Sequence, residues 1–242
     1  GYAEAIVGSS NKVLVKEAFS RQGSRYDDLV ELRPRVWFNE TLESRNFIIP
    51  GLIAVIMMIV AALLTSLTVA KEWERGTMEQ LISTPIKAGE LIVGKFIPYF
   101  VIGIVDVLIA VTMGCFIFHV PFRGNVLELF ILASIFLTGV SCWGILISVL
   151  TKNQFMASQI SFITTFLPAF LLSGFAFPII NMPKPIELVT CIIPARYFVT
   201  ILKGVYLKGV GLRILWPEAV ILVGFSILMI FLAKTKFKKR VA

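Results

Sequence analysis

The chain has 242 residues, of which 57% are hydrophobic and only 16% are charged, with a formal net charge of +8. An ordinary soluble domain carries about 25% charged residues, so a soluble monomer could not bury this much apolar surface. The composition excludes disordered and collagen-like chains, and the three cysteines are too few for a disulfide framework. Because the basic residues lie mostly at the ends of apolar runs, we attribute the positive charge to membrane topology and predict no nucleic-acid partner.

Residues 1–46 are predicted to be the C-terminal part of an α+β extracytoplasmic domain. A helical apolar stripe runs through Tyr2 to Gln22, and apolar and polar residues alternate from Val30 to Phe38 as in a half-buried strand. One helix and one strand are too little to fold alone. The chain begins at Gly1 without a signal peptide although this segment must be exported. We therefore expect an N-terminally truncated protein that lacks an earlier span.

Residues 47–242 are predicted to be a transmembrane domain. Crossing about 30 Å of hydrocarbon takes roughly 20 residues of helix, and five apolar runs are long enough. The sequence thus predicts an all-α polytopic membrane protein with five transmembrane helices. Their expected bounds are residues 47–70, 96–120, 127–150, 155–177 and 214–233.

The orientation of these spans follows from the lysines and arginines in the short connections. Ten lie on the side that carries the loop 71–95 and the basic tail, and six lie on the other side. We therefore predict a cytoplasmic C-terminus and a cytoplasmic loop 71–95, with residues 1–46 outside the cytoplasm.

The connection 178–213 is rich in Pro and Gly yet still apolar, which is unusual for an external loop. One interpretation is an extracytoplasmic re-entrant hairpin, whose backbone is satisfied by protein or by an aqueous lumen. The alternative is an amphipathic segment that lies at the membrane interface with Lys184 and Glu187 in water.

Asp106 is the one ionisable residue deep within a predicted span. A charge at that depth costs about 3 kcal/mol on insertion scales, and such groups usually face the bundle interior. Two roles remain open: a part in the transport path or in gating, and a structural hydrogen bond to a neighbouring helix.

Sites for catalysis, metals or cofactors are not evident in the sequence. His119 is the only histidine, so zinc-type ligand spacing is absent, and no catalytic pair of carboxylates appears. Gly89 to Phe96 follows the spacing of a phosphate-binding loop but ends in Phe where the Mg²⁺-binding hydroxyl should be. We therefore predict no metal site and no cofactor bound by this chain, and no enzymatic activity of its own.

The loop 71–95 carries the most informative pattern. Charged residues alternate closely with Trp73, Met78 and Leu81, so a short helix here could lie on the membrane surface or enter a groove on a partner. An ordinary charged loop that stops one helix and starts the next would show a similar spacing.

A resemblance to a known family distinguishes these alternatives. The chain resembles type-2 permeases of ATP-binding-cassette transporters, the membrane subunits of ATP-driven exporters, over about residues 39–240. The likeness rests on the loop with Glu72, Glu74, Arg75, Gly76, Thr77, Glu79 and Leu81, closing on Thr84-Pro85, and on Glu90-Leu91, Gly94-Lys95, Glu43 to Phe47, Leu172 to Pro178, Pro194 to Tyr197 and Leu207 to Gly209.

The resemblance implies a division of labour. A separate cytoplasmic ATPase uses ATP and Mg²⁺, and a coupling helix at about Glu72 to Ile82 transmits its motion to the spans. The candidate ATPase contacts are Glu72, Glu74, Arg75 and Glu79. Trp73 and Met78 are the candidate apolar anchors. It also implies a dimer with a second copy or a paralogue, and export of an amphipathic or hydrophobic substrate such as a drug or lipid. The subgroup with a large external domain suggests a bacterial inner membrane and a periplasmic adaptor.

A second function class is an ATPase-independent membrane scaffold or secondary transporter. An ion-driven carrier usually shows paired interrupted helices in two halves and several intramembrane charges. This chain has one such charge and no evident internal repeat, which favours the exporter.

Overall fold

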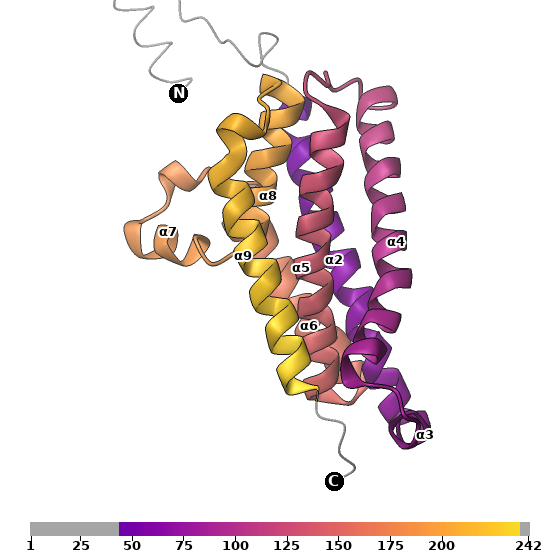
Figure 1. Cartoon of the computed structure of the whole chain (residues 1–242). Coiled ribbons are helices and arrows are strands. Elements are labelled where there is room, and N and C mark those ends of the chain that lie inside the picture. The colour runs from indigo at the N-terminus through magenta and orange to yellow at the C-terminus, as the bar shows by residue number, and fades with distance from the viewer. Residues whose placement is uncertain (1–43, 238–242) are drawn as a thin grey trace, which may run out of the picture. The chain divides into compact units, whose positions relative to one another are not determined.

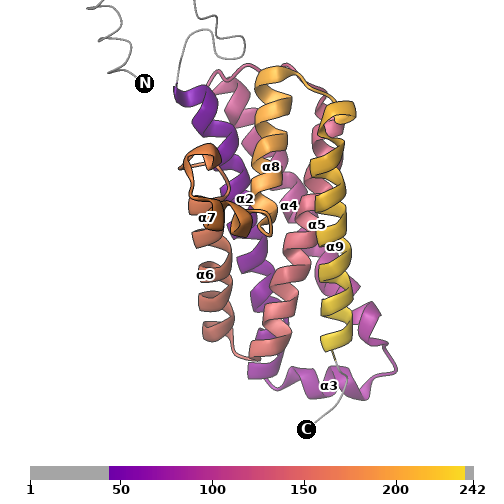
Figure 2. The ribbon, with the colours of Figure 1, turned by 90° about the vertical axis from the view of Figure 1, so that its left-hand side faces the viewer.

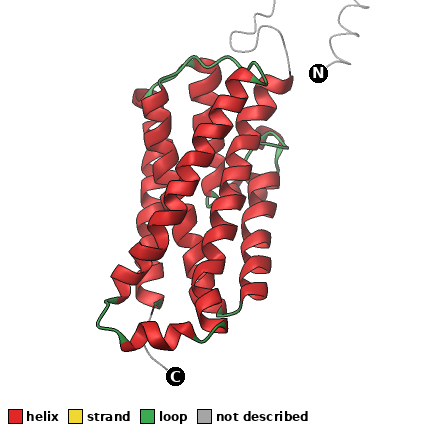
Figure 3. Cartoon of the chain, turned by 90° about the vertical axis from the view of Figure 1, so that its right-hand side faces the viewer, coloured by secondary structure: helices red, strands yellow, loops and turns green. Residues whose placement is uncertain are grey.

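The computed structural model describes residues 44–237. The predicted helix at Tyr2 to Gln22 and the predicted strand at Val30 to Phe38 therefore lie outside the described residues. Within the described residues the chain consists of helices and connecting loops, without strands (Figure 3). The long helices run side by side in one bundle (Figure 1).

Within residues 44–237, five helices are long and apolar enough to cross a membrane, so the chain is a multi-pass membrane protein. These helices are α2 (Ser44–Glu74), α4 (Ala88–Phe116), α5 (Val126–Thr151), α6 (Gln154–Leu172) and α9 (Leu212–Lys236).

The helix bounds depart from the predicted spans by one to eight residues, most at the second and fourth helices. The second was expected over 96–120, but α4 begins eight residues earlier at Ala88 and ends at Phe116. Polarity predicts where hydrocarbon begins, whereas the backbone continues as helix through Glu90 and Lys95. The fourth was expected to reach residue 177, but α6 ends at Leu172, shortly before Gly174 takes the left-handed φ of 80°.

Side-chain caps explain where the helices begin. The Asn125 side chain accepts a hydrogen bond from the Leu127 backbone N–H at 2.9 Å, and Asn153 does the same for Met156 at 2.9 Å. Both caps satisfy N–H groups that have no partner within the helix. Lys152 adopts a φ of 53°, and the resulting tight turn returns the chain from α5 into α6.

Helix α5 forms the centre of the bundle. It contacts α2, α4, α6, α8 and α9, and 67% of its most apolar window is buried, against 17% for α4 and 22% for α6. Small residues bring its backbone close to its neighbours, as is common between membrane helices. A side chain at Gly144 would meet the Ala62 carbonyl oxygen of α2 at 2.5 Å.

The connection between α6 and α9 folds into short helices: η1 (Ile179–Asn181), α7 (Lys184–Thr190), α8 (Pro194–Lys203) and η2 (Gly204–Lys208). The axes of α7 and of the α8–η2 segment differ by 84°. In Figure 2, α7 lies beside the end of α6, and α8 runs between α2 and α9. The chain thus turns back into the bundle before it reaches α9.

Contacts on three sides hold α8 in place. The Phe198 ring stacks on Phe136 of α5 with centroids 4.1 Å apart. The Lys203 ammonium donates to the Gly174 carbonyl oxygen at 2.9 Å and lies 3.3 Å from the centre of the Phe47 ring of α2. Helix α8 is therefore an integral part of the bundle and not a segment resting on its surface.

Candidate coupling site

The coupling helix was expected at about Glu72 to Ile82, but the structure continues α2 to Glu74 and forms a separate short helix, α3 (Thr77–Ser83), after the turn at Gly76. Gly76 adopts a left-handed φ of 71°, which glycine reaches without steric cost, and the chain leaves the α2 axis there. At the other end Thr84 is extended, with ψ 156°. The residue before a proline disfavours the helical region, so Pro85 ends α3.

One face of α3 packs on the bundle. Met78 is only 2% exposed, in a cluster with Val69 of α2, Ile92 of α4 and Ile145 of α5, and Leu81 packs at its edge. We expected Met78 to anchor a partner, but its burial directs it into this chain. It therefore fixes α3 to the ends of three spans.

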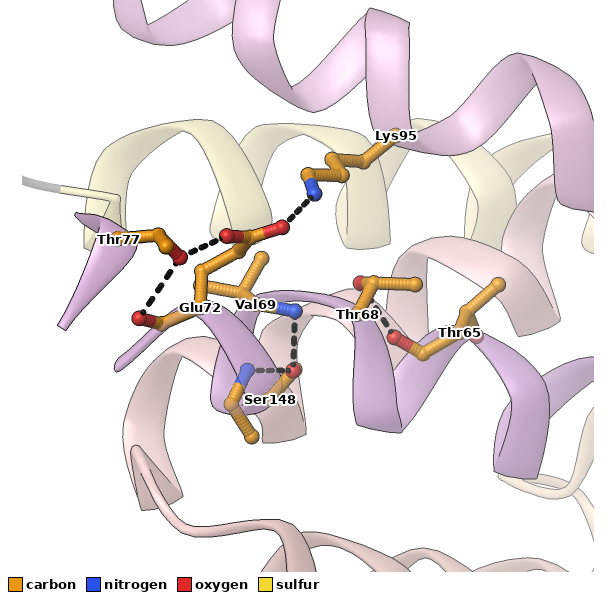
Figure 4. A network of polar contacts seen from close by, with 8 residues as sticks. Thr65, Thr68, Val69, Glu72, Thr77, Lys95 and Ser148 are labelled. Atoms are coloured by element: carbon orange, nitrogen blue, oxygen red, sulfur yellow. Dashed lines mark hydrogen bonds and ion pairs between the residues drawn. The ribbon is translucent and has the colours of Figure 1, made fainter. Parts of the chain in front are cut away.

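Glu72 and Lys95 join the end of α2 to the start of α4 (Figure 4). The Lys95 ammonium nitrogen lies 2.5 Å from a Glu72 carboxylate oxygen, and the Thr77 hydroxyl donates to the other oxygen. The same hydroxyl lies 3.3 Å from the Glu72 carbonyl oxygen. Glu72, predicted as a partner contact, thus closes the corner between α2, α3 and α4.

Trp73 and Glu74 connect the same corner to the turn between α5 and α6. The Lys152 ammonium lies 4.3 Å from the centre of the Trp73 ring. Glu74 accepts hydrogen bonds from the Gln154 backbone N–H at 2.8 Å and from its side-chain amide at 2.5 Å. A carboxylate at this helix N-terminus is favourable because it faces unpaired N–H groups and the positive end of the helix dipole.

The remaining predicted residues are Arg75, in the turn before α3, and Glu79, on α3 itself. Both are exposed, as is Gln80 next to Glu79. A groove of about 790 Å³ lies between α3 and α4, and Glu72, Gln80, Glu90 and Lys95 are among its lining residues. The site thus presents charged and polar side chains at the end of the bundle where α9 also ends (Figures 1 and 2).

Asp106 lies apart from this site, near the middle of α4, and is half-buried. Within residues 44–237 no hydrogen bond or ion pair reaches its carboxylate. The structural hydrogen bond that we considered for Asp106 is therefore not formed in the described part of the chain.

Several residues of the site carried no role in the sequence interpretation. Gln154 is distant in sequence from Glu74. Lys152 is likewise distant from Trp73, and only the turn after α5 brings the two side chains together. Lys95 and Thr77 belong to the family motif, but their spacing from Glu72 does not indicate that they share its carboxylate. Among residues 44–237 no cluster of three or more His, Cys, Asp and Glu side chains could hold a metal ion.

Comparison with known proteins places this architecture in a family. A family model described as ABC-2 family transporter protein matches residues 13–233. The chain belongs to this family. Over 240 residues, this ABC-2 chain is 43% identical to the probable multidrug ABC transporter permease YbhS of Escherichia coli strain K12, an alignment that covers 99% of the chain and 63% of the relative.

More distant relatives share the same region. The probable multidrug ABC transporter permease YbhR of the same organism is 35% identical over 189 residues, which are 77% of this chain and 50% of the relative. ABC transporter G family member 20 of Dictyostelium discoideum is 25% identical over 203 residues, 83% of this chain and 28% of the relative. The chain thus spans less than two thirds of the length of these curated relatives.

Proposed function

We propose that the chain is the membrane-spanning part of an ABC exporter permease that moves an amphipathic or hydrophobic substrate, such as a drug or a lipid, out of the cytoplasm or the membrane. ATP and Mg²⁺ are used by a separate ATPase subunit. The names of the bacterial relatives, probable multidrug permeases, support the substrate class. The permease works as a pair in the bacterial inner membrane, with α3 and the C-terminus in the cytoplasm, and passes substrate to a periplasmic adaptor.

The observation that carries this proposal is the construction of α3. Its inner face is fixed to α2, α4 and α5 through Met78, and its corner is closed by Glu72 and Lys95. Glu79 on α3 and Arg75 in the turn before it are exposed to solvent. A force that a partner applies to these residues would be transmitted directly to three spans, because no mobile loop lies between α3 and the spans to absorb the displacement. Coupling to an ATPase requires such a direct connection.

The large apolar faces of α4 and α6 support the pairing. Only 17% and 22% of their most apolar windows are buried within the chain. Lipid or a second permease subunit would cover these faces, and the proposed pair uses part of this surface.

The test is co-purification of the full-length permease with the ATPase encoded beside it, comparing wild type with Glu79→Lys and Arg75→Glu. Both residues are exposed, so reversal should release the ATPase while the permease stays folded. Glu74→Lys is unsuitable, because it would remove the hydrogen bonds to Gln154. Lys184→Glu, an equally exposed reversal on α7, is the matched control.

If wild type and the Lys184→Glu control retain an active ATPase while both α3 variants lose it, the proposal stands. If no ATPase binds to wild type, or if the α3 variants bind it as wild type does, the exporter mechanism is refuted.

A further inference from the structure

Near the cytoplasmic end of α2, a side chain of α5 forms hydrogen bonds with the α2 backbone. The Ser148 hydroxyl oxygen accepts hydrogen bonds from two consecutive N–H groups, those of Val69 at 3.0 Å and Ala70 at 2.8 Å (Figure 4). In a regular α-helix these N–H groups donate to the carbonyl oxygens four residues earlier. A side chain that inserts into this ladder is one of the few established causes of a sharp helix bend.

The carbonyl groups of the same turns also have side-chain partners. The Thr68 hydroxyl donates to the Thr65 carbonyl oxygen at 2.7 Å, and Thr65 donates to that of Ala61 at 2.7 Å. Ser66 donates to the Leu63 carbonyl oxygen at 2.8 Å. Hydroxyl groups that bond back to carbonyls in this way also favour bending.

These hydroxyls lower the cost of opening one helical turn inside a membrane. An unpaired backbone group in hydrocarbon is expensive, so a spanning helix normally resists opening. At Val69, however, the backbone N–H can pair with the Ser148 hydroxyl while the Thr65 carbonyl oxygen keeps the Thr68 hydroxyl. This pair of backbone groups can therefore separate without leaving either of them unpaired.

Close packing between α5 and α2, one turn before Ser148 on α5, sets the point about which α2 would tilt. Gly144 lies four residues before Ser148, on the same face, and a side chain there would meet the backbone of Ala62. The two helix backbones are therefore in contact at Ala62, about two turns of α2 before the hydrogen bonds of Ser148. Beyond this point, Glu72 and Met78 tie α3 to the last turn of α2.

We propose that Ser148 is a positioning residue that forms a hinge in α2, at which a displacement of α3 becomes a change in the angle of the span. The inference rests on the proposed function, because α3 moves only if an ATPase acts on it. Ser148 supplies an acceptor that the Val69 and Ala70 N–H groups keep while the turn opens, so the hinge bends without breaking its link to α5.

The test is hydrogen exchange of the Val69 and Ala70 amides in the full-length permease with its ATPase, without nucleotide and after trapping with ATP and vanadate. In wild type, trapping should leave the exchange of these amides slow, because they keep the Ser148 hydroxyl as acceptor when the turn opens. In Ser148→Ala, trapping should raise their exchange by about fivefold to tenfold, the size expected for one lost net hydrogen bond. Ser141→Ala, which removes an equally buried hydroxyl two turns away, should behave as wild type.

Ser148→Cys keeps the size of the side chain and a weak acceptor, so its exchange should lie between wild type and Ser148→Ala; it decides the question if the alanine variant does not fold. Absence of bound ATPase refutes the proposed function before exchange is measured. A bound, active ATPase with no rise in exchange at Val69 and Ala70 when Ser148→Ala is trapped refutes the hinge alone. So does an exchange rate in both Ser148 variants that equals that of wild type.

Discussion

The contact between α5 and α2 at Gly144 permits a quantitative test of the packing. An added side chain would meet the Ala62 carbonyl oxygen at 2.5 Å and would also overlap the Thr65 hydroxyl. The carbonyl belongs to the backbone of a buried helix, so Gly144→Ala must push α2 and α5 apart. Overpacking of this kind costs about 1 to 3 kcal/mol, and contact with backbone places it at the upper end.

The same substitution also gains helix propensity, about 1 kcal/mol for replacing Gly by Ala. The net loss for Gly144→Ala is therefore about 2 kcal/mol, which corresponds to a fall of about 4 to 8 °C in Tm for a domain of this size. Gly224 of α9 has open space where its side chain would be. Gly224→Ala should keep the propensity gain and leave Tm unchanged or slightly raised.

The assay is thermal unfolding of the detergent-solubilised full-length permease, with both alanine variants measured beside wild type. An unchanged Tm for Gly144→Ala, or a larger fall for Gly224→Ala, would show that the two backbones are not in contact and would refute the packing argument.

Three further variants address the coupling site and the span beside it. Met78→Ala should free α3 from the bundle at a cost of about 2 to 3 kcal/mol, seen as faster hydrogen exchange of residues 77–83, whereas Glu79→Ala should leave that exchange unchanged; equal effects would place Met78 outside the core. Breaking the pair of Glu72 and Lys95, whose side chains are 23% and 28% exposed, should cost about 1 kcal/mol, the upper end for surface ion pairs; a double-mutant cycle in Tm that gives a much larger coupling energy would contradict this assignment. Asp106→Asn should leave Tm unchanged, because within residues 44–237 no polar partner of Asp106 is lost; a clear fall in Tm would reveal a structural partner, while loss of dye efflux at unchanged Tm would assign Asp106 to the transport path.

Within residues 44–237 the amino-acid sequence by itself indicated five spans and the loop that contains α3. Apolar runs of about 20 residues have few alternatives to membrane helices, whereas the predicted start of the short helix at Glu72 was five residues too early. The exact helix bounds could not be predicted from hydropathy, because the helical backbone of α4 continues through charged residues that hydropathy assigns to a loop.

Only the tertiary structure decided which face of each helix is buried and which polar groups meet. Membrane helices are apolar all round, so periodicity does not distinguish a face toward lipid from one toward protein. On the short helix α3, too, the sequence does not tell whether Met78 points toward a partner or into the chain. Only the placement of α3 on the bundle decides this. The pairings of Glu74 with Gln154 and of Ser148 with the α2 backbone join residues about 80 positions apart, and only the packing of complete helices brings such groups together.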